Sequence, residues 1–65
     1  MWIRSQNKKY LIKAIGLVVD DNLVRCAIDT RFYIVGEYTN RERALEVLDE
    51  IQNNLNKEVF EMPEE

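Results

Sequence analysis

Short stretches in which apolar and polar residues alternate dominate the first 38 residues, and polar turns separate them. Alternation of this kind, rich in β-branched and aromatic residues, is typical of β-strands. The pattern predicts strands at residues 2–5, 10–19, 23–29 and 32–38. Because the turns are too short for a parallel crossover, we expect neighbouring strands to run antiparallel, as a four-stranded β-meander.

Three of these strands carry more specific signals. Gly16 interrupts the second strand, and a glycine inside a strand often marks a β-bulge. In the third strand Val24, Cys26 and Ile28 share one face, which predicts that Cys26 is an inert thiol in the core. Strict alternation in the fourth strand places Ile34, Gly36 and Tyr38 opposite Tyr33, Val35 and Glu37.

An amphipathic helix follows the last strand. Thr39 and Glu42 have the spacing of a capping box, and Asn40 is an alternative cap one residue later. The spacing of one helical face is shown by Ala44, Val47, Leu48, Ile51 and Leu55. The helix is expected to end between residues 54 and 57, where asparagines accumulate, and the predicted fold class is α+β.

Residues 58–65 form an acidic segment that contains Val59, Phe60 and Met62 and is stopped by Pro63. The sequence predicts a single domain over residues 1–57 and two alternatives for the rest. The segment is either a disordered tail or an arm that docks its apolar side chains on a neighbouring chain.

Composition narrows the function classes. The 65 residues include one cysteine and no histidine, so a disulfide, a zinc cluster and a Cys–His or Ser–His catalytic pair are not expected. No glycine-rich phosphate loop, signal peptide or membrane span is recognised. We therefore expect a cytoplasmic, non-catalytic protein without a metal or cofactor.

Charge is distributed unevenly along the chain. Residues 1–36 carry six basic and three acidic side chains, a net charge of +3, whereas residues 37–65 carry three basic and nine acidic ones, a net charge of −6. Guanidinium groups bind phosphates and aromatic rings stack on bases. The candidate ligand-binding residues in the predicted sheet are Arg4, Arg25, Lys13, Arg31, Trp2, Tyr10 and Tyr33. The alternative is that they are ordinary solvated charges with core aromatics between them.

Two segments resemble small phage and prophage proteins of Gram-positive bacteria. Those proteins often begin with the motif that Ile3-Arg4-Ser5-Gln6 matches, and residues 34–52, which include Gly36-Glu37-Tyr38 and Glu42 to Gln52, resemble their ending. The resemblance implies a phage origin. Small phage proteins of this kind include anti-defence factors, among them inhibitors of host nucleases and sponges for nucleotide signals.

Together these observations favour a protein that antagonises host antiviral defence by sequestering a phosphate-bearing nucleotide signal. A single helix covers only one face of the predicted sheet, so a homo-oligomer is expected as well. The rival is a direct protein–protein inhibitor of a host defence enzyme, an anti-CRISPR-like nucleic-acid mimic, and a structural or regulatory phage protein is a third option. The mimic would use Glu46, Asp49, Glu50, Glu61, Glu64 and Glu65.

Overall fold

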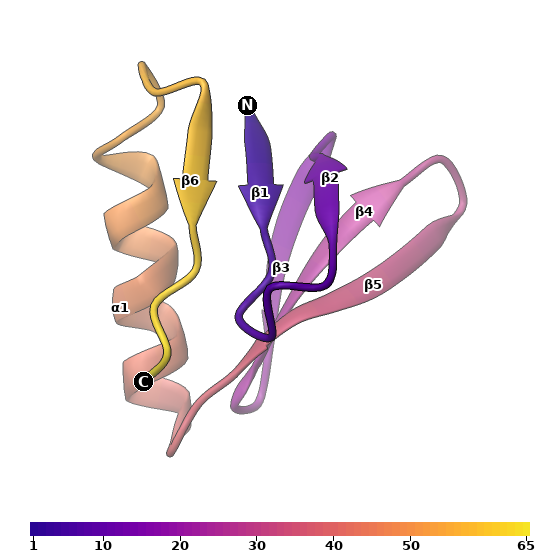
Figure 1. The fold of residues 1–65 in the computed structure, drawn as a ribbon. Helices are drawn as coiled ribbons and strands as arrows, with labels where there is room; N and C mark the ends of the chain where they lie inside the picture. Colours follow the sequence, from indigo (N-terminus) through magenta and orange to yellow (C-terminus); the bar gives the residue numbers. More distant parts are fainter.

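The computed structural model describes all residues from 1 to 65 and confirms an α+β fold with antiparallel strands and one helix. Its elements are β1 (Trp2–Arg4), β2 (Leu11–Lys13), β3 (Gly16–Asp20), β4 (Leu23–Ile28), β5 (Arg31–Glu37), α1 (Arg41–Gln52) and β6 (Val59–Glu61). The last residues of the chain lie beside the start of α1, where Glu65 bonds Thr39 and Arg43 (Figure 1). No helix has the length and apolar character needed to cross a membrane.

The strands form two three-stranded sheets, so the prediction of a single four-stranded meander is wrong. The order is β2-β1-β6 in one sheet and β3-β4-β5 in the other, and β6 runs parallel to β1. The predicted long second strand divides at Ala14 and Ile15. The N–H of Ala14 still donates to Met1 in the first sheet, whereas that of Ile15 donates to Ala27 in the second. The interruption at Gly16 is therefore a change of sheet rather than a bulge.

Left-handed backbone conformations define the three hairpin turns. Asp21 and Asp29, with φ of 55° and 54°, lie in the two-residue turns that join β3 to β4 and β4 to β5. Aspartate tolerates this conformation better than most residues. Between β1 and β2 the left-handed residue is Lys8, with φ of 68°, while the side chain of Asn7 accepts hydrogen bonds from Ser5 and Lys9.

A register shift between β4 and β5 changes the predicted faces of β5. Val24 pairs with Gly36 and Arg25 pairs with Ile34, so Val35 is an extra residue in β5. As a result Val35 and Gly36 are both buried, while Ile34 is half exposed. The strict alternation expected for this strand is wrong from Ile34 onward, because a bulge moves the following side chains to the other face.

Asn40, the alternative cap, begins α1 by accepting a hydrogen bond from the backbone N–H of Arg43. The expected capping box at Thr39 is not formed, because the Thr39 hydroxyl instead bonds the carboxylate of Glu65. The helix lies against β3 and β4 and buries Ala44, Val47 and Ile51. Leu48 is half-buried and Leu55 is exposed, since the helix ends at Gln52 and no longer directs Leu55 toward the core.

One hydrophobic core joins both sheets and the helix. Its buried members are Ile3, Ile12, Val24, Cys26, Val35, Tyr38, Ala44, Val47, Ile51, Phe60 and Met62. Burial of Cys26 agrees with the prediction of a core thiol, and burial raises the pKa of that thiol.

The acidic C-terminal segment is part of this core. Its Phe60 and Met62 are buried by the same chain, and the N–H of Met62 continues the pairing with β1 by donating to Arg4. Neither expectation for residues 58–65, a disordered tail or an arm on a neighbouring chain, describes this structure. Burial of two large apolar side chains gives the segment a place within its own fold.

Candidate ligand-binding face

The candidate site is the outward face of the sheet β2-β1-β6. In each of its strands the central residue is buried and the two flanking residues are exposed, so alternate side chains form two rows on the outer side. The registers give these rows as Lys13–Trp2–Val59 and Leu11–Arg4–Glu61. The opposite face supplies Ile3, Ile12 and Phe60 to the core. The fold thus fixes this outer face from beneath.

Trp2 and Lys13 are direct cross-strand neighbours on this face. Trp2 is 40 % exposed, which leaves much of its indole ring accessible, and Lys13 is exposed beside it. Val59 is the register partner of Trp2 on the other side, in β6. An accessible ring next to an ammonium group is suited to hold a flat base and an adjacent negative charge.

Arg4 lies one row further along the same strand, and its guanidinium is oriented by the hairpin. Its Nε donates to the carbonyl of Lys8 at 3.0 Å, which leaves the two terminal nitrogens for an external acceptor. Lys8 also pairs with the Glu61 carboxylate at 3.2 Å. Because Glu61 is the register partner of Arg4, this ion pair reduces the repulsion that an anionic ligand would meet there.

The seven predicted site residues do not all converge. Trp2, Arg4 and Lys13 share the outer face, whereas Tyr10 precedes β2 and is 48 % exposed in the connection between β1 and β2. The other three belong to the second sheet: Arg25 in β4, and Arg31 and Tyr33 in β5.

Arg25 is engaged where it lies. Its guanidinium pairs with Asp20 at 3.0 Å, and its buried Nε has no hydrogen-bond acceptor. Because Asp20 of the neighbouring strand β3 already pairs with this guanidinium, Arg25 is less suited to bind an anionic ligand.

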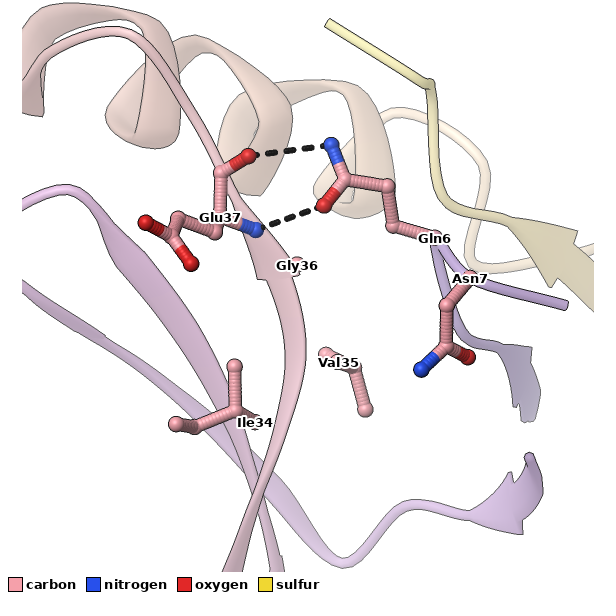
Figure 2. A pocket seen from close by; sticks show the side chains of 6 residues that line it. All are labelled: Gln6, Asn7, Ile34, Val35, Gly36 and Glu37. Carbon is pink, nitrogen blue, oxygen red and sulfur yellow. Dashed lines mark hydrogen bonds between the residues drawn. The ribbon is translucent and has the colours of Figure 1, made fainter. Parts of the chain in front are cut away.

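A hollow of about 210 Å³ lies elsewhere, at the edge of β5, and none of the seven predicted residues lines it. Figure 2 shows the carboxamide of Gln6 at one end of it, paired with the backbone of Glu37. Gln6 Oε1 accepts from the Glu37 N–H at 2.8 Å and Nε2 donates to the Glu37 carbonyl at 3.0 Å. The side chain therefore occupies the place of one peptide unit of an additional strand.

The sequence pattern predicts only a polar connection at Gln6, between the strands expected at residues 2–5 and 10–19, and Gln6 is also the last residue of the segment Ile3–Gln6. The structure gives every residue of Ile3–Gln6 a part in the fold: Gln6 bonds the edge of β5, and the other three act in the core or the hairpin. Ile3 is buried, Arg4 bonds the turn, and Ser5, which is 1 % exposed, donates to Asn7 and accepts from the N–H of Tyr10. The segment Ile3–Gln6 is thus explained by folding requirements.

The acidic half of the chain is partly neutralised by Arg43. This guanidinium contacts Glu50 at 2.9 Å and Glu46 at 3.3 Å, and it donates to the backbone carbonyl of Glu65 at 2.7 Å. The hydrogen bond to Glu50 is the main reason that the pKa of Arg43 is raised. The structure contains no group of three or more histidine, cysteine, aspartate or glutamate side chains that could hold a metal ion.

Comparison of the chain with protein families, curated proteins and solved structures finds no match.

Proposed function

We propose that the chain is a non-catalytic binding protein whose outer β2-β1-β6 face holds a phosphate-bearing nucleotide. The observation that supports it is the placement of the accessible Trp2 ring beside Lys13, with Arg4 one row along the same strand. Rows on one face of a strand are separated by about 6.8 Å, the scale of the distance between a base and its phosphate. Stacking and charge pairing can therefore act on the same ligand.

In this proposal each side chain has one role. Trp2 stacks on the base, and Lys13 contributes a point charge beside it. The terminal nitrogens of Arg4, already oriented through Nε by the turn, bind phosphate oxygens as a two-pronged donor. A ligand held in this way is sequestered, which is the effect that this proposal assigns to the protein.

The biological setting rests on the resemblance of residues 3–6 and 34–52 to small phage proteins. We propose that the sequestered nucleotide is a signal of host antiviral defence and that the protein acts in the host cytoplasm. The reducing environment suits a chain whose one cysteine is free.

Isothermal titration calorimetry with linear and cyclic nucleotides tests the proposal. Arg4→Ala should weaken binding roughly ten- to a hundred-fold, since a charge-assisted bond contributes about 1.5–3 kcal/mol. Trp2→Ala should cost a similar factor through about 1–3 kcal/mol of stacking. Arg25→Ala is the matched control: it removes the same charge from the other sheet and should leave affinity unchanged.

The proposal fails if no nucleotide of the panel binds, or if Arg25→Ala weakens binding as much as Arg4→Ala does. Retained inhibition of a host defence enzyme without nucleotide binding would favour the rival, direct inhibition through acidic groups. In that case Asp49→Asn, which removes an exposed acid that forms no salt bridge, should reduce inhibition while Arg4→Ala should not.

A further inference from the structure

β5 has an open edge over the first four of its residues. β5 pairs with β4 on one side only, and on the other side the chain supplies nothing but Gln6. Gln6 bonds the carbonyl of Val35 and both backbone groups of Glu37, at the far end of the strand. Residues 31–34 are all exposed. Most natural edges are protected by charges or proline, whereas this one presents Phe32, Tyr33 and Ile34.

The hairpin register shows which backbone groups face the open edge. The two-residue turn between β4 and β5 closes at Ile28 and Arg31, which are therefore a hydrogen-bonded pair. Alternation makes Tyr33 the next residue bonded to β4. The same alternation directs the N–H and C=O of Phe32 and the N–H of Ile34 away from β4. These groups have no partner within the chain.

The open edge is complementary to itself. An antiparallel copy related by a two-fold axis at Tyr33 brings Phe32 of each chain opposite Ile34 of the other, where their outward backbone groups can bond. Phe32 and Ile34 are 59 % and 51 % exposed, and an aromatic side chain beside a β-branched one is a favourable cross-strand pair. Each copy would thus cover apolar surface of the other.

Charge does not oppose this arrangement. The only charged residues of β5, Arg31 and Glu37, lie outside the three residues that would pair, so no like charges meet within Phe32 to Ile34. We propose that the occupant of this edge is a second copy of the chain, and that two β5 strands join their sheets into one of six strands. The inference does not depend on nucleotide binding, because the ligand face lies on the other sheet.

Sedimentation velocity from about 10 to 500 μM tests the association, a range chosen because a short interface between two strand edges is expected to be weak. The parent should approach twice its mass of 7.7 kDa. Phe32→Lys should raise the dissociation constant on the order of ten-fold or more. Leu55→Lys is the matched control, because Leu55 is 65 % exposed outside β5 and its substitution should change nothing.

A cysteine at the two-fold axis tests the register. Tyr33 would face its own copy as a non-hydrogen-bonded pair with Cα atoms about 4.5 Å apart, within the range of a disulfide. Both cysteine variants are made in a Cys26→Ala background, because Cys26 lies directly opposite residue 33 on β4 and would compete for the new thiol. Mild oxidation of Tyr33→Cys should then give a covalent dimer much faster than oxidation of Leu55→Cys. A parent that stays monomeric, association that Phe32→Lys does not weaken, or equal oxidation rates would each overturn the proposal.

Discussion

The ring of Tyr38 lies directly over the α-carbon of Gly36. A Cβ atom built on Gly36 would come within 2.7 Å of Cε2 of that ring. The ring cannot easily move aside, because Tyr38 is buried and its hydroxyl donates to the carbonyl of Pro63 at 2.8 Å. Gly36 is thus required by close packing between β5, α1 and the C-terminal segment.

Gly36→Ala should therefore lower the free energy of unfolding by about 1–3 kcal/mol, the usual cost of overpacking. Denaturant unfolding measures the change. Gly16→Ala is the control, since nothing lies within 4 Å of a Cβ at Gly16. A loss at Gly16 equal to that at Gly36 would show that glycine flexibility, and not the Tyr38 ring, sets the requirement.

The same tyrosine should make stability depend on pH in the alkaline range. Burial, opposed in part by Arg43, raises the pKa of Tyr38 from 10.0 to about 12. Below pH 10 both folded and unfolded chains keep the proton. Above pH 10 the unfolded chain releases it first, so stability falls as the pH rises from about 10 to about 12.

The difference between a Tyr38 pKa of 10.0 and one of about 12 corresponds to about 2–3 kcal/mol of unfolding free energy. Urea unfolding of the parent and of Tyr38→Phe across this range isolates the contribution of Tyr38, because every other titrating group is common to both. The parent should lose more stability than the variant between pH 10 and 12. Parallel pH profiles would contradict the assignment.

The local pattern of the sequence predicted the turns, the helix and the buried thiol, because neighbouring residues determine them. It did not predict where the chain changes sheet. Residues 10–19 read as one continuous strand, and only pairing with Met1 and with Ala27, far apart in sequence, divides them. Burial of Phe60 likewise depends on the parallel pairing of β6 with β1, which no local signal encodes.

For the candidate site, too, the sequence predicted local features but not long-range pairing. Charge and aromatic character within the predicted strands suggested Trp2, Arg4 and Lys13 as candidates, and the β1–β2 register places them on one face. Arg25 fits the same local pattern but belongs to another sheet, where Asp20 neutralises it. Gln6 carried no such signal, because its role depends on meeting the edge of β5.

The helix offers a further stability test. Ile51 is 2 % exposed in the core, so Ile51→Ala should cost about 2–5 kcal/mol of unfolding free energy, most of what so small a domain has. Leu55→Ala, at a position 65 % exposed, should change it by less than about 0.5 kcal/mol. Thermal melting followed by circular dichroism distinguishes them. Similar losses at both positions would mean that the helix extends beyond Gln52 and buries Leu55.

The C-terminal segment provides the last prediction, because two neighbouring residues of β6 differ sharply in burial. Phe60 is 7 % exposed and faces the core opposite Ile3, whereas Val59 is 44 % exposed on the outer face. Phe60→Ala should therefore cost about 3–5 kcal/mol, enough to unfold much of the population, while Val59→Ala should cost well under 1 kcal/mol. Hydrogen exchange gives a second measurement, since pairing of β6 with β1 should protect the N–H of Trp2, which donates to Glu58 at 2.9 Å. A Phe60→Ala variant as stable as the parent, with a rapidly exchanging Trp2 amide, would show that residues 58–65 do not belong to the folded unit.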